Sequence, residues 1–298
     1  DGSLGARNDL ICSSIEHKLG IHGSPTAVMS FGDNGGAIGY LMGEPNRGLE
    51  YMFTMMNHAR LNVGLEGVAI SERAYQQARD YARDRVQGRP IGAAAGTPIV
   101  GHPDVRRMLL DMKSRIDAMR ALAYYTAGRM DVAHGHPDER TRNEAQALVD
   151  LLTPVVKGWC TENSIQIAST GVQVHGGVGF VEETGAAQHY RDARITTIYE
   201  GTTAIQANDL VGRKIARDGG AAAAALIGLM RGSIAEWKIQ DQLLLIAQRA
   251  EAAVGLFERA VQWILGRHNE APALTAAGAV PFLHLAGIVT GGWLMGKQ

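Results

Sequence analysis

The spacing of apolar residues separates a strand-like beginning from a long helical remainder. Residues 27–31 and 37–42 are short apolar runs, and the turn sequence Asp33-Asn34-Gly35-Gly36 lies between them. Two apolar runs joined by such a glycine-rich turn are typical of a β-hairpin. We therefore expect strands within residues 1 to about 48, where a loop around Pro45 ends this pattern.

Four long helical segments follow, at about 49–86, after His102-Pro103-Asp104, at about 140–174 and at 201–216. In the second, apolar side chains recur every three or four residues, which places them on one face of a helix. These side chains are Val105, Met108, Leu109, Met112, Ile116, Met119 and Ala123. Four such segments predict a helical bundle.

A further helical region follows the break at Asp218-Gly219-Gly220, and its strongest segment covers 240–265. The apolar stretch 281–295 is too short to span a bilayer and contains His284, so we expect a core helix there. The chain is thus predicted to be mainly α. We expect the closing strands of a β-domain at 1–48, a four-helix bundle at 49–216 and a helical extension at 217–298.

Composition restricts the class of function. The net charge is −1, which argues against a nucleic-acid binder with a broad basic face. The two cysteines, Cys12 and Cys160, offer no disulfide framework, and this fits a reducing cytoplasm. His134 and His136 lack acidic or cysteine partners at metal spacing, so we predict no metal site.

Two segments could carry chemistry. Tyr199-Glu200-Gly201-Thr202 places a carboxylate beside a glycine at the start of a helix, where it could project into a cleft. A carboxylate favoured by the helix dipole, with Thr202 as N-cap, explains the same residues without catalysis. Residues 173–180 end a helix in glycines whose N–H groups could approach a phosphate, or could simply form a turn. The sequence alone leaves both alternatives open.

Together, in this order and spacing, these segments resemble the acyl-CoA dehydrogenase family from residue 1 to about residue 216. The family's late hallmark is a helix that ends in Q-x-x-GG-x-G-F, followed by R-D-A-[RK]-x-x-x-I-Y-E-G-T. The chain matches it with Gln173, Gly176, Gly177, Gly179, Phe180 and residues 191–202. Residues 18–31 resemble the last part of the family's middle β-domain. Residues 221–298 resemble the added helical domain of larger bacterial members, including the methylmercaptopropionyl-CoA dehydrogenase type.

The resemblance implies an FAD enzyme that oxidises an acyl-CoA thioester to its trans-2-enoyl-CoA. Glu200 matches the base that removes the α-proton, and the flavin N5 would accept the β-hydride. The Glu200 N–H, with a flavin ribityl hydroxyl, would polarise the thioester carbonyl. Gly201 falls at a substrate-binding position and Thr202 at a flavin-contacting position.

The resemblance also implies contacts to the FAD of a neighbouring subunit. Gln173, Gly176 and Gly177 match the loop that holds the adenosine-pyrophosphate of that FAD. Arg85 matches the arginine of the family's R-x-x-F-G motif, which reaches the same pyrophosphate. Here the motif reads Arg85-Val86-Gln87-Gly88, without the phenylalanine.

For the substrate, Asn57 and Arg60 match positions near the CoA-bearing end of the cleft, where relatives usually carry aspartate in place of Asn57. Ala204 stands where many relatives carry glutamine. Some relatives place the base one residue before the arginine that matches Arg60. Ala59 occupies that position here and cannot accept a proton, so Glu200 is the only candidate at either family position.

The resemblance further implies an acyl-CoA substrate, an electron-transfer flavoprotein as electron acceptor, and a homodimer or homotetramer. It also implies that the chain is the carboxyl-terminal half of a longer protein. We therefore expect the 298 residues alone to hold FAD poorly and not to oxidise acyl-CoA.

Two other classes of function remain open. One is a related flavoenzyme of the nitroalkane-oxidase or the alkylation-response type. The former carries aspartate as its base where this chain has Glu200, and the latter should carry a basic surplus. The other class is a non-catalytic helical oligomerisation module. It would explain the helices but not the succession of Gly176-Gly177 and Glu200-Gly201-Thr202.

Overall fold

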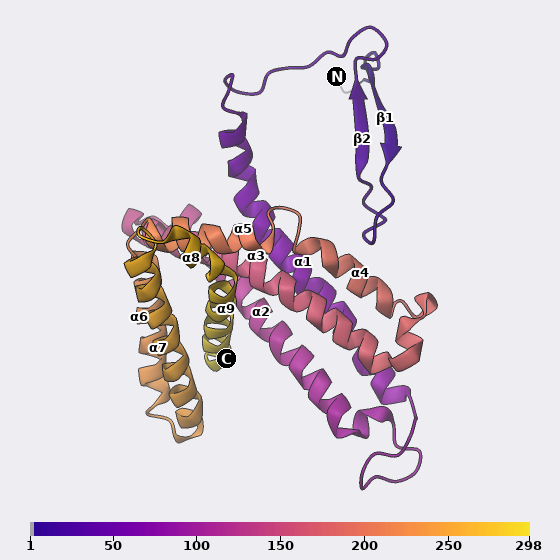
Figure 1. Cartoon of the computed structure of the whole chain (residues 1–298), viewed down its shortest axis with the longest axis vertical. Helices are drawn as coiled ribbons and strands as arrows, with labels where there is room; N and C mark the ends of the chain where they lie inside the picture. The colour runs from indigo at the N-terminus through magenta and orange to yellow at the C-terminus, as the bar shows by residue number, and fades with distance from the viewer. Residues whose placement is uncertain (1–2) are drawn as a thin grey trace. The chain divides into compact units, whose positions relative to one another are not determined.

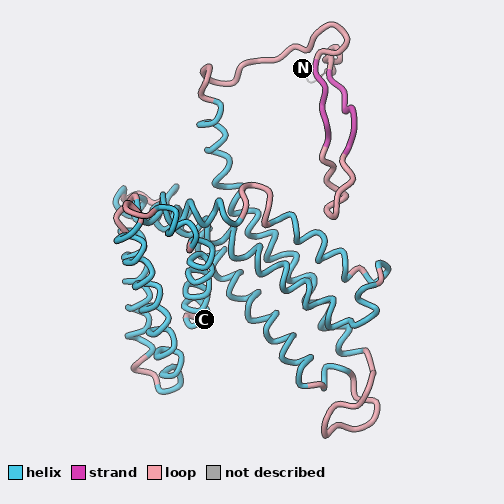
Figure 2. The backbone as a smooth tube through the Cα atoms, in the orientation of Figure 1, coloured by secondary structure: helices cyan, strands magenta, loops and turns pink. Residues whose placement is uncertain are grey.

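The computed structural model describes residues 3–298, in two compact units that divide between Met56 and Asn57. Helices make up most of the regular structure in this described range, and its two strands lie in the first unit (Figures 1 and 2). The mainly α fold predicted from the sequence is therefore confirmed.

The first unit contains an antiparallel hairpin of β1 (Leu10–Ile15) and β2 (Ala27–Phe31). The register places Leu10 opposite Phe31. The expected pairing of residues 27–31 with 37–42 is wrong, because 37–42 is not a strand and β2 pairs with β1 instead.

Two side chains just before β1 explain why the second apolar run stays outside the hairpin. Asn8 Oδ1 accepts a hydrogen bond from the N–H of Ile38 at 2.9 Å. Asp9 Oδ2 accepts from the N–H groups of Asn34 at 2.7 Å and Gly36 at 3.1 Å, and the bond from Asn34 is the main cause of a lowered pKa of Asp9. The backbone is thus held as a loop by side chains rather than by a neighbouring strand.

Three long helices follow: α1 (Gly48–Asp84), which begins in the first unit and continues into the second, α2 (Pro103–Gly135) and α3 (Glu139–His175). These three helices confirm the segments predicted at 49–86, after His102-Pro103-Asp104 and at 140–174. Each predicted boundary lies within two residues of the observed one. The apolar face expected for α2 is confirmed, since Leu109 to Ala123 supply its most buried side chains. In Figure 1, α2, α3 and α4 run side by side.

Shorter elements surround the fourth predicted helix. That helix is α5 (Thr203–Asn208), continued by the wider π-helical segment η4 (Asp209–Ala216). The sequence did not predict α4 (Ala186–Thr196), which packs on α3. The remaining elements of this part are short 3-10 turns: η1 (Ile99–Gly101), η2 (Gly176–Phe180) and η3 (Glu182–Thr184).

Two glycines allow α1 and α3 to lie close together. A Cβ at Gly64 would lie 2.5 Å from a methyl of Val156, and a Cβ at Gly67 would lie 3.0 Å from the Cys160 carbonyl oxygen. In the part of α3 that meets α1, every residue from 151 to 160 is buried. A helix without a solvent face in this stretch forms the centre of the unit.

The predicted break at Gly219 and Gly220 is confirmed by their φ values of +65° and +81°. Beyond it lie α6 (Ala221–Trp237), η5 (Asp241–Leu243), α7 (Leu244–Arg267), α8 (Pro272–Ala277) and α9 (Ala279–Gly296). One hydrophobic core continues from the bundle into these helices. The division of the chain at residues 48 and 216 stays a prediction.

The last helix, α9, is the one helix of the described range long and apolar enough to cross a membrane by length and composition. Its buried side chains contact α2, α3 and α7, and a Cβ at Gly287 would lie 2.2 Å from the Trp159 ring of α3. A mostly buried helix of this kind is what the core of a helical protein contains, so the apolar composition of α9 is weak evidence for a membrane span.

Candidate active site

The turn between α4 and α5 holds Glu200 in a backbone conformation that side chains rarely adopt. Glu200 has a φ of +56° and Gly201 a φ of +94°. The left-handed region costs a non-glycine residue roughly 1–2 kcal/mol. A Cβ at Gly201 would also lie 2.7 Å from Nε2 of Gln206. Such strain persists only where surrounding contacts impose it, and it gathers at functional sites.

Two buried side chains impose the conformation of this turn, which we call the Glu200 turn (Glu200, Gly201 and Thr202). Lys157 of α3 donates from Nζ to the Gly201 carbonyl at 2.6 Å. Gln206 of α5 donates from Nε2 to the carbonyls of Glu200 at 3.2 Å and Gly201 at 3.4 Å. Both side chains are fully buried, so two neighbouring helices hold the Gly201 carbonyl, and α5 also holds the Glu200 carbonyl.

Thr202 is the N-cap of α5, as one interpretation of the sequence predicted, and its hydroxyl accepts from the N–H of Ile205 at 3.4 Å. Its contact with flavin stays a prediction. The Glu200 side chain is half-buried. Among the described residues, no acceptor is assigned to the Glu200 N–H, which leaves this donor free to meet an oxyanion.

Lys157 carries a buried charge behind the Glu200 turn. Desolvation lowers the pKa of Lys157 to about 8. The carboxylates of Glu162, Glu200 and Glu66 oppose this shift, and the cation of Arg60 adds to it. Lys157 was not among the residues singled out from the sequence.

Arg60 is buried and its charge is already paired. Its guanidinium lies 3.3 Å from Oδ2 of Asp209 in η4, and both side chains are less than a tenth exposed. Asp209 also faces Arg213 at 3.7 Å. Asn57, three residues earlier on α1, is exposed. The structure thus places Arg60 beside the element that follows the Glu200 turn, and the CoA contacts of both residues stay predictions.

The other candidate residues gather around the glycine loop, which is η2 (Gly176–Phe180). Gln173, Gly176 and Gly177 are exposed at the end of α3, and Gly176 has a φ of +63°. His175 stacks on Tyr81 of α1 with ring centroids 4.5 Å apart. Arg85 lies one turn beyond Tyr81, since its N–H donates to the Tyr81 carbonyl. Arg85 therefore lies one helical turn from the residue that stacks on His175, which directly precedes the glycine loop.

The two groups of candidate residues lie far apart. Arg60 and Arg85 are 25 residues apart on the straight path of α1, which corresponds to roughly 37 Å at a rise of 1.5 Å per residue. The structure brings Arg60 to the Glu200 turn and Arg85 to the glycine loop, but it does not bring the two groups together.

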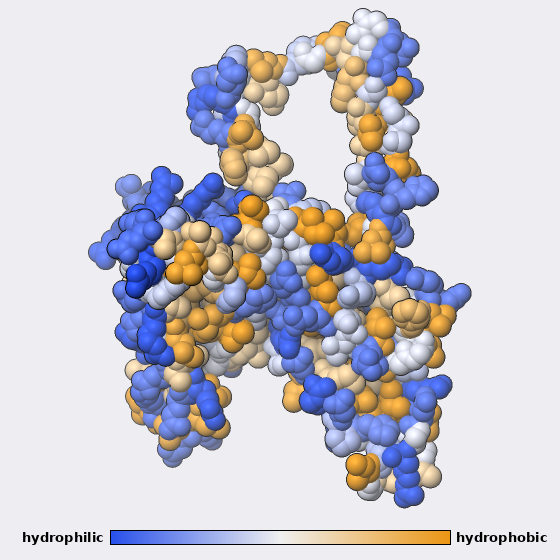
Figure 3. Space-filling view, viewed as in Figure 1, coloured by the Kyte–Doolittle hydropathy of each residue, from blue (hydrophilic) through white to orange (hydrophobic). Residues whose placement is uncertain are grey.

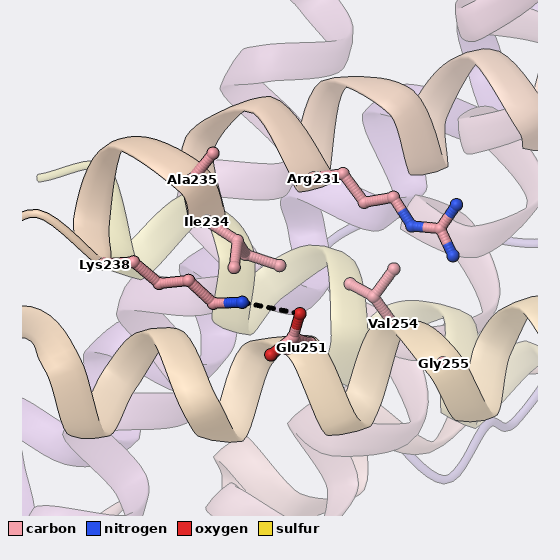
Figure 4. A pocket seen from close by; sticks show the side chains of 7 residues that line it. All are labelled: Arg231, Ile234, Ala235, Lys238, Glu251, Val254 and Gly255. Carbon is pink, nitrogen blue, oxygen red and sulfur yellow. Dashed lines mark hydrogen bonds and ion pairs between the residues drawn. The ribbon is translucent and has the colours of Figure 1, made fainter.

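The described part of the helical unit contains several hollows, and two of them can be placed against the candidate residues. One, of about 690 Å³, lies between the end of α1, His175 and the start of α4, where His189 Nε2 donates to Oε1 of Gln77 at 3.0 Å. The other, of about 370 Å³, is an open groove between α6 and α7. In Figure 4 the Lys238–Glu251 ion pair, 2.7 Å long, bridges this groove beside Ile234 and Val254. Glu200 lines neither hollow.

The described residues contain no group of three or more histidine, cysteine, aspartate or glutamate side chains that could hold a metal ion. On the face drawn in Figure 3, apolar and hydrophilic side chains are interspersed over the helices. The arrangement of metal-ligating side chains and the surface in this view therefore identify no second candidate site among the described residues.

The family described as "Acyl-CoA dehydrogenase, C-terminal domain" matches residues 46–215, more than half of the chain. This chain belongs to the acyl-CoA dehydrogenase family. A second family, described as "Acetyl-CoA dehydrogenase C-terminal like", matches residues 226–298. The two matched ranges cover the Glu200 turn, the glycine loop and most of the extension beyond α5 and η4.

Relatives and solved structures agree with this family. The 3-methylmercaptopropionyl-CoA dehydrogenase of Ruegeria pomeroyi is 52% identical over 99% of this chain and 50% of its own length. Caenorhabditis elegans ACDH-11 in complex with C11-CoA superposes with a TM-score of 0.80 at 22% identity, over 97% of this chain and 46% of that one. The Bacillus anthracis acyl-CoA dehydrogenase complexed with FAD gives 0.75 at 22% identity, over 95% and 48%. The chain spans about half the length of these acyl-CoA dehydrogenases.

Proposed function

We propose that the enzyme containing this chain carries out FAD-dependent α,β-dehydrogenation of an acyl-CoA thioester to trans-2-enoyl-CoA, with Glu200 as the α-proton base. The observation that carries the proposal is the left-handed conformation of Glu200, held by contacts from two helices. Backbone strain that neighbouring elements impose is a mark of functional sites. The family membership supports dehydrogenation as the reaction of this site.

In this reaction a thioester α-proton, which is weakly acidic, must be removed while charge develops on the carbonyl oxygen. The Glu200 carboxylate would accept the α-proton, and a positioned base contributes roughly 10²–10⁴-fold. The Glu200 N–H would donate to the carbonyl oxygen, where one such donor contributes roughly 2.7–4 kcal/mol. The electron pair of the Cα–H bond becomes the new double bond as the hydride leaves Cβ. When bound, FAD supplies the hydride acceptor at N5.

The residues around the glycine loop fit the pyrophosphate end of FAD. A Cβ at Gly176 or Gly177 would meet no atom within 4 Å, so the space over the loop is open to a ligand. The exposed Gln173 amide and the Arg85 guanidinium add donors of the kind that phosphates bind. Thr202 is the residue that would contact the flavin end.

The separation of the two groups supports an oligomer. Because the Glu200 turn and the glycine loop lie at separate places along α3, each chain would contact two FAD molecules, one of them shared with a neighbouring subunit. A homodimer or a homotetramer meets this requirement. An electron-transfer flavoprotein is the proposed electron acceptor, and a cytoplasmic location is proposed with it.

For the substrate, 3-methylmercaptopropionyl-CoA is the first acyl-CoA to test, because the Ruegeria pomeroyi relative carries that name at 52% identity. CoA recognition near Asn57 and Arg60 is part of the same proposal. A short acyl chain that contains a thioether and saturated acyl chains of increasing length would be compared as substrates.

Glu200→Gln tests the proposal in the complete enzyme. The amide keeps the size of the side chain but cannot accept the α-proton. We expect the variant to retain FAD and to lose at least ~10²-fold in turnover, the low end for a general base. Flavin absorbance gives the FAD content, and reduction of an artificial electron acceptor gives the turnover.

Glu183→Gln is the matched control, because Glu183 is an exposed carboxylate near the start of α4. This control should retain normal turnover. Near-normal dehydrogenation by Glu200→Gln would remove Glu200 from the mechanism and leave the site without a base.

A further inference from the structure

Lys157 is a lone cation inside the most buried stretch of the protein. It is fully buried and lies on α3 among residues 151–160, all of which are buried. A buried ammonium group is unfavourable unless hydrogen bonds and opposite charges compensate for its desolvation. Lys157 donates its hydrogen bond to a backbone carbonyl, that of Gly201 at 2.6 Å, and not to a carboxylate.

We propose that Lys157 is a positioning residue, which holds the Glu200 turn in its left-handed conformation and so directs the Glu200 carboxylate toward the substrate. This inference rests on the proposed function of Glu200. The ammonium acts through the Gly201 carbonyl, one peptide unit beyond Glu200. Gln206 donates to the same carbonyl at the longer distance of 3.4 Å, so Lys157 is the stronger of the two constraints.

The surrounding charges explain why an ammonium can remain at this place. Arg60 and Glu66 face it from α1, Glu162 from α3 itself, and Glu200 from the turn. Three of these neighbours are carboxylates, which favour the charged ammonium, and one is a guanidinium, which disfavours it. Desolvation still lowers the pKa of Lys157 to about 8. Below that pH the charged donor is present. Above it a neutral amine remains, which is a weaker donor to the Gly201 carbonyl.

Lys157→Met in the complete enzyme is the first test, because it keeps an unbranched side chain one atom shorter and removes the donor. We expect FAD content and KM to stay within about twofold while kcat falls by roughly 10–10²-fold, since a displacement of about 1 Å in a reacting group costs up to 10²-fold. Exchange of the substrate's α-protons with solvent deuterium should slow by the same factor. A merely structural lysine would change thermal stability and leave turnover per bound flavin unchanged.

Thr153→Val is the matched control. Thr153 lies one turn before Lys157 on α3, is buried, and donates to Val149 within its own helix at 2.7 Å. This variant loses a buried hydrogen bond without touching the Glu200 turn. It should lose stability but keep its turnover per flavin and its rate of α-proton exchange.

Lys157→Arg keeps the test decisive if Lys157→Met does not fold. Arginine stays protonated over the working pH range. We expect the kcat of the wild-type enzyme to fall as pH rises through about 8. The Lys157→Arg variant should have most of the wild-type activity and should lack this fall. The inference is overturned if Lys157→Met matches wild type in turnover per flavin, or if Lys157→Arg keeps the alkaline fall.

Glu200→Gln measured in parallel separates this inference from the proposed function. If Glu200→Gln loses turnover and Lys157→Met does not, only the role of Lys157 is wrong. If Glu200→Gln keeps normal turnover, the proposed function fails and the role of Lys157 fails with it.

Discussion

At the scale of single residues, the two groups of candidate residues differ in whether their positively charged side chains are buried or exposed. At the Glu200 turn, Arg60 and Lys157 are buried and meet partners within the chain. Near the glycine loop, Arg85 is exposed, and its guanidinium donates a hydrogen bond to the neutral Gln87 side chain at 3.1 Å. A buried cation can fix protein geometry, whereas an exposed cation with a neutral partner is available to an external anion.

Arg85→Ala should weaken FAD retention more than it alters the chemical step. A lost charge-assisted bond to pyrophosphate costs roughly 1.5–3 kcal/mol, and oligomer stability should fall with it because the FAD would be shared. Titration of the apoprotein with FAD measures the first effect and sedimentation the second. Arg83→Ala, an exposed arginine in the last turn of α1, is the control. Equal FAD affinity in both variants would show that Arg85 is only a surface residue.

At the scale of elements, glycine spacing decides which helices can approach. Gly67→Ala places a methyl group 3.0–3.2 Å from the backbone of Cys160 and Thr161, and backbone cannot move aside as a side chain can. We expect a loss of roughly 1–3 kcal/mol in the free energy of unfolding, as for other overpacked cores. Urea denaturation measures it.

Gly128→Ala in α2 is the matched change, because no atom lies within 4 Å of the added methyl. Without a clash, the higher helix propensity of alanine should raise the free energy of unfolding by up to about 1 kcal/mol. The same sign of effect in both variants would contradict the close approach of α1 and α3.

Long periodic segments were predictable from the sequence, and short or unusual elements were not. The three long helices were found because apolar spacing repeats over many turns. α4 was missed because its 11 residues include only two apolar side chains larger than alanine, Tyr190 and Ile195. The partner of β2 was assigned wrongly because Asn8 and Asp9, which hold the loop, lie far from it in sequence.

The candidate site shows the same limit. Motif spacing singled out Glu200 and the glycine loop, but not Lys157. A single lysine in an otherwise apolar run, Leu151 to Cys160, was the available signal, and its partner is a backbone carbonyl with no residue type to mark it. Likewise, the pairing of Arg60 with Asp209 depends on two segments that are 149 residues apart.

At the scale of the whole molecule, α9 ties the extension to the bundle. Gly287→Ala would place a methyl group 2.2 Å from the Trp159 ring, and overpacking of this kind costs roughly 1–3 kcal/mol. Because one core continues through residues 61–294, amide-exchange protection in α2 and in α7 should fall together. Hydrogen exchange followed by mass spectrometry measures both.

Gly292→Ala, on the same helix with no atom within 4 Å of the added methyl, should leave protection in both regions unchanged. If Gly287→Ala lowers amide-exchange protection in α7 alone, the extension unfolds as a separate domain. That result would agree with the predicted division at residue 216.

The left-handed φ of Glu200 has a consequence for anyone who engineers this enzyme. Glycine or asparagine adopts that conformation more readily than glutamate, so a screen for heat resistance that measures folding alone would favour replacing Glu200. Such a variant would survive heating better and would lack the proposed base. A stabilisation campaign on this protein therefore needs turnover as a second criterion at this position, because selection for thermal tolerance and selection for catalysis act there in opposite directions.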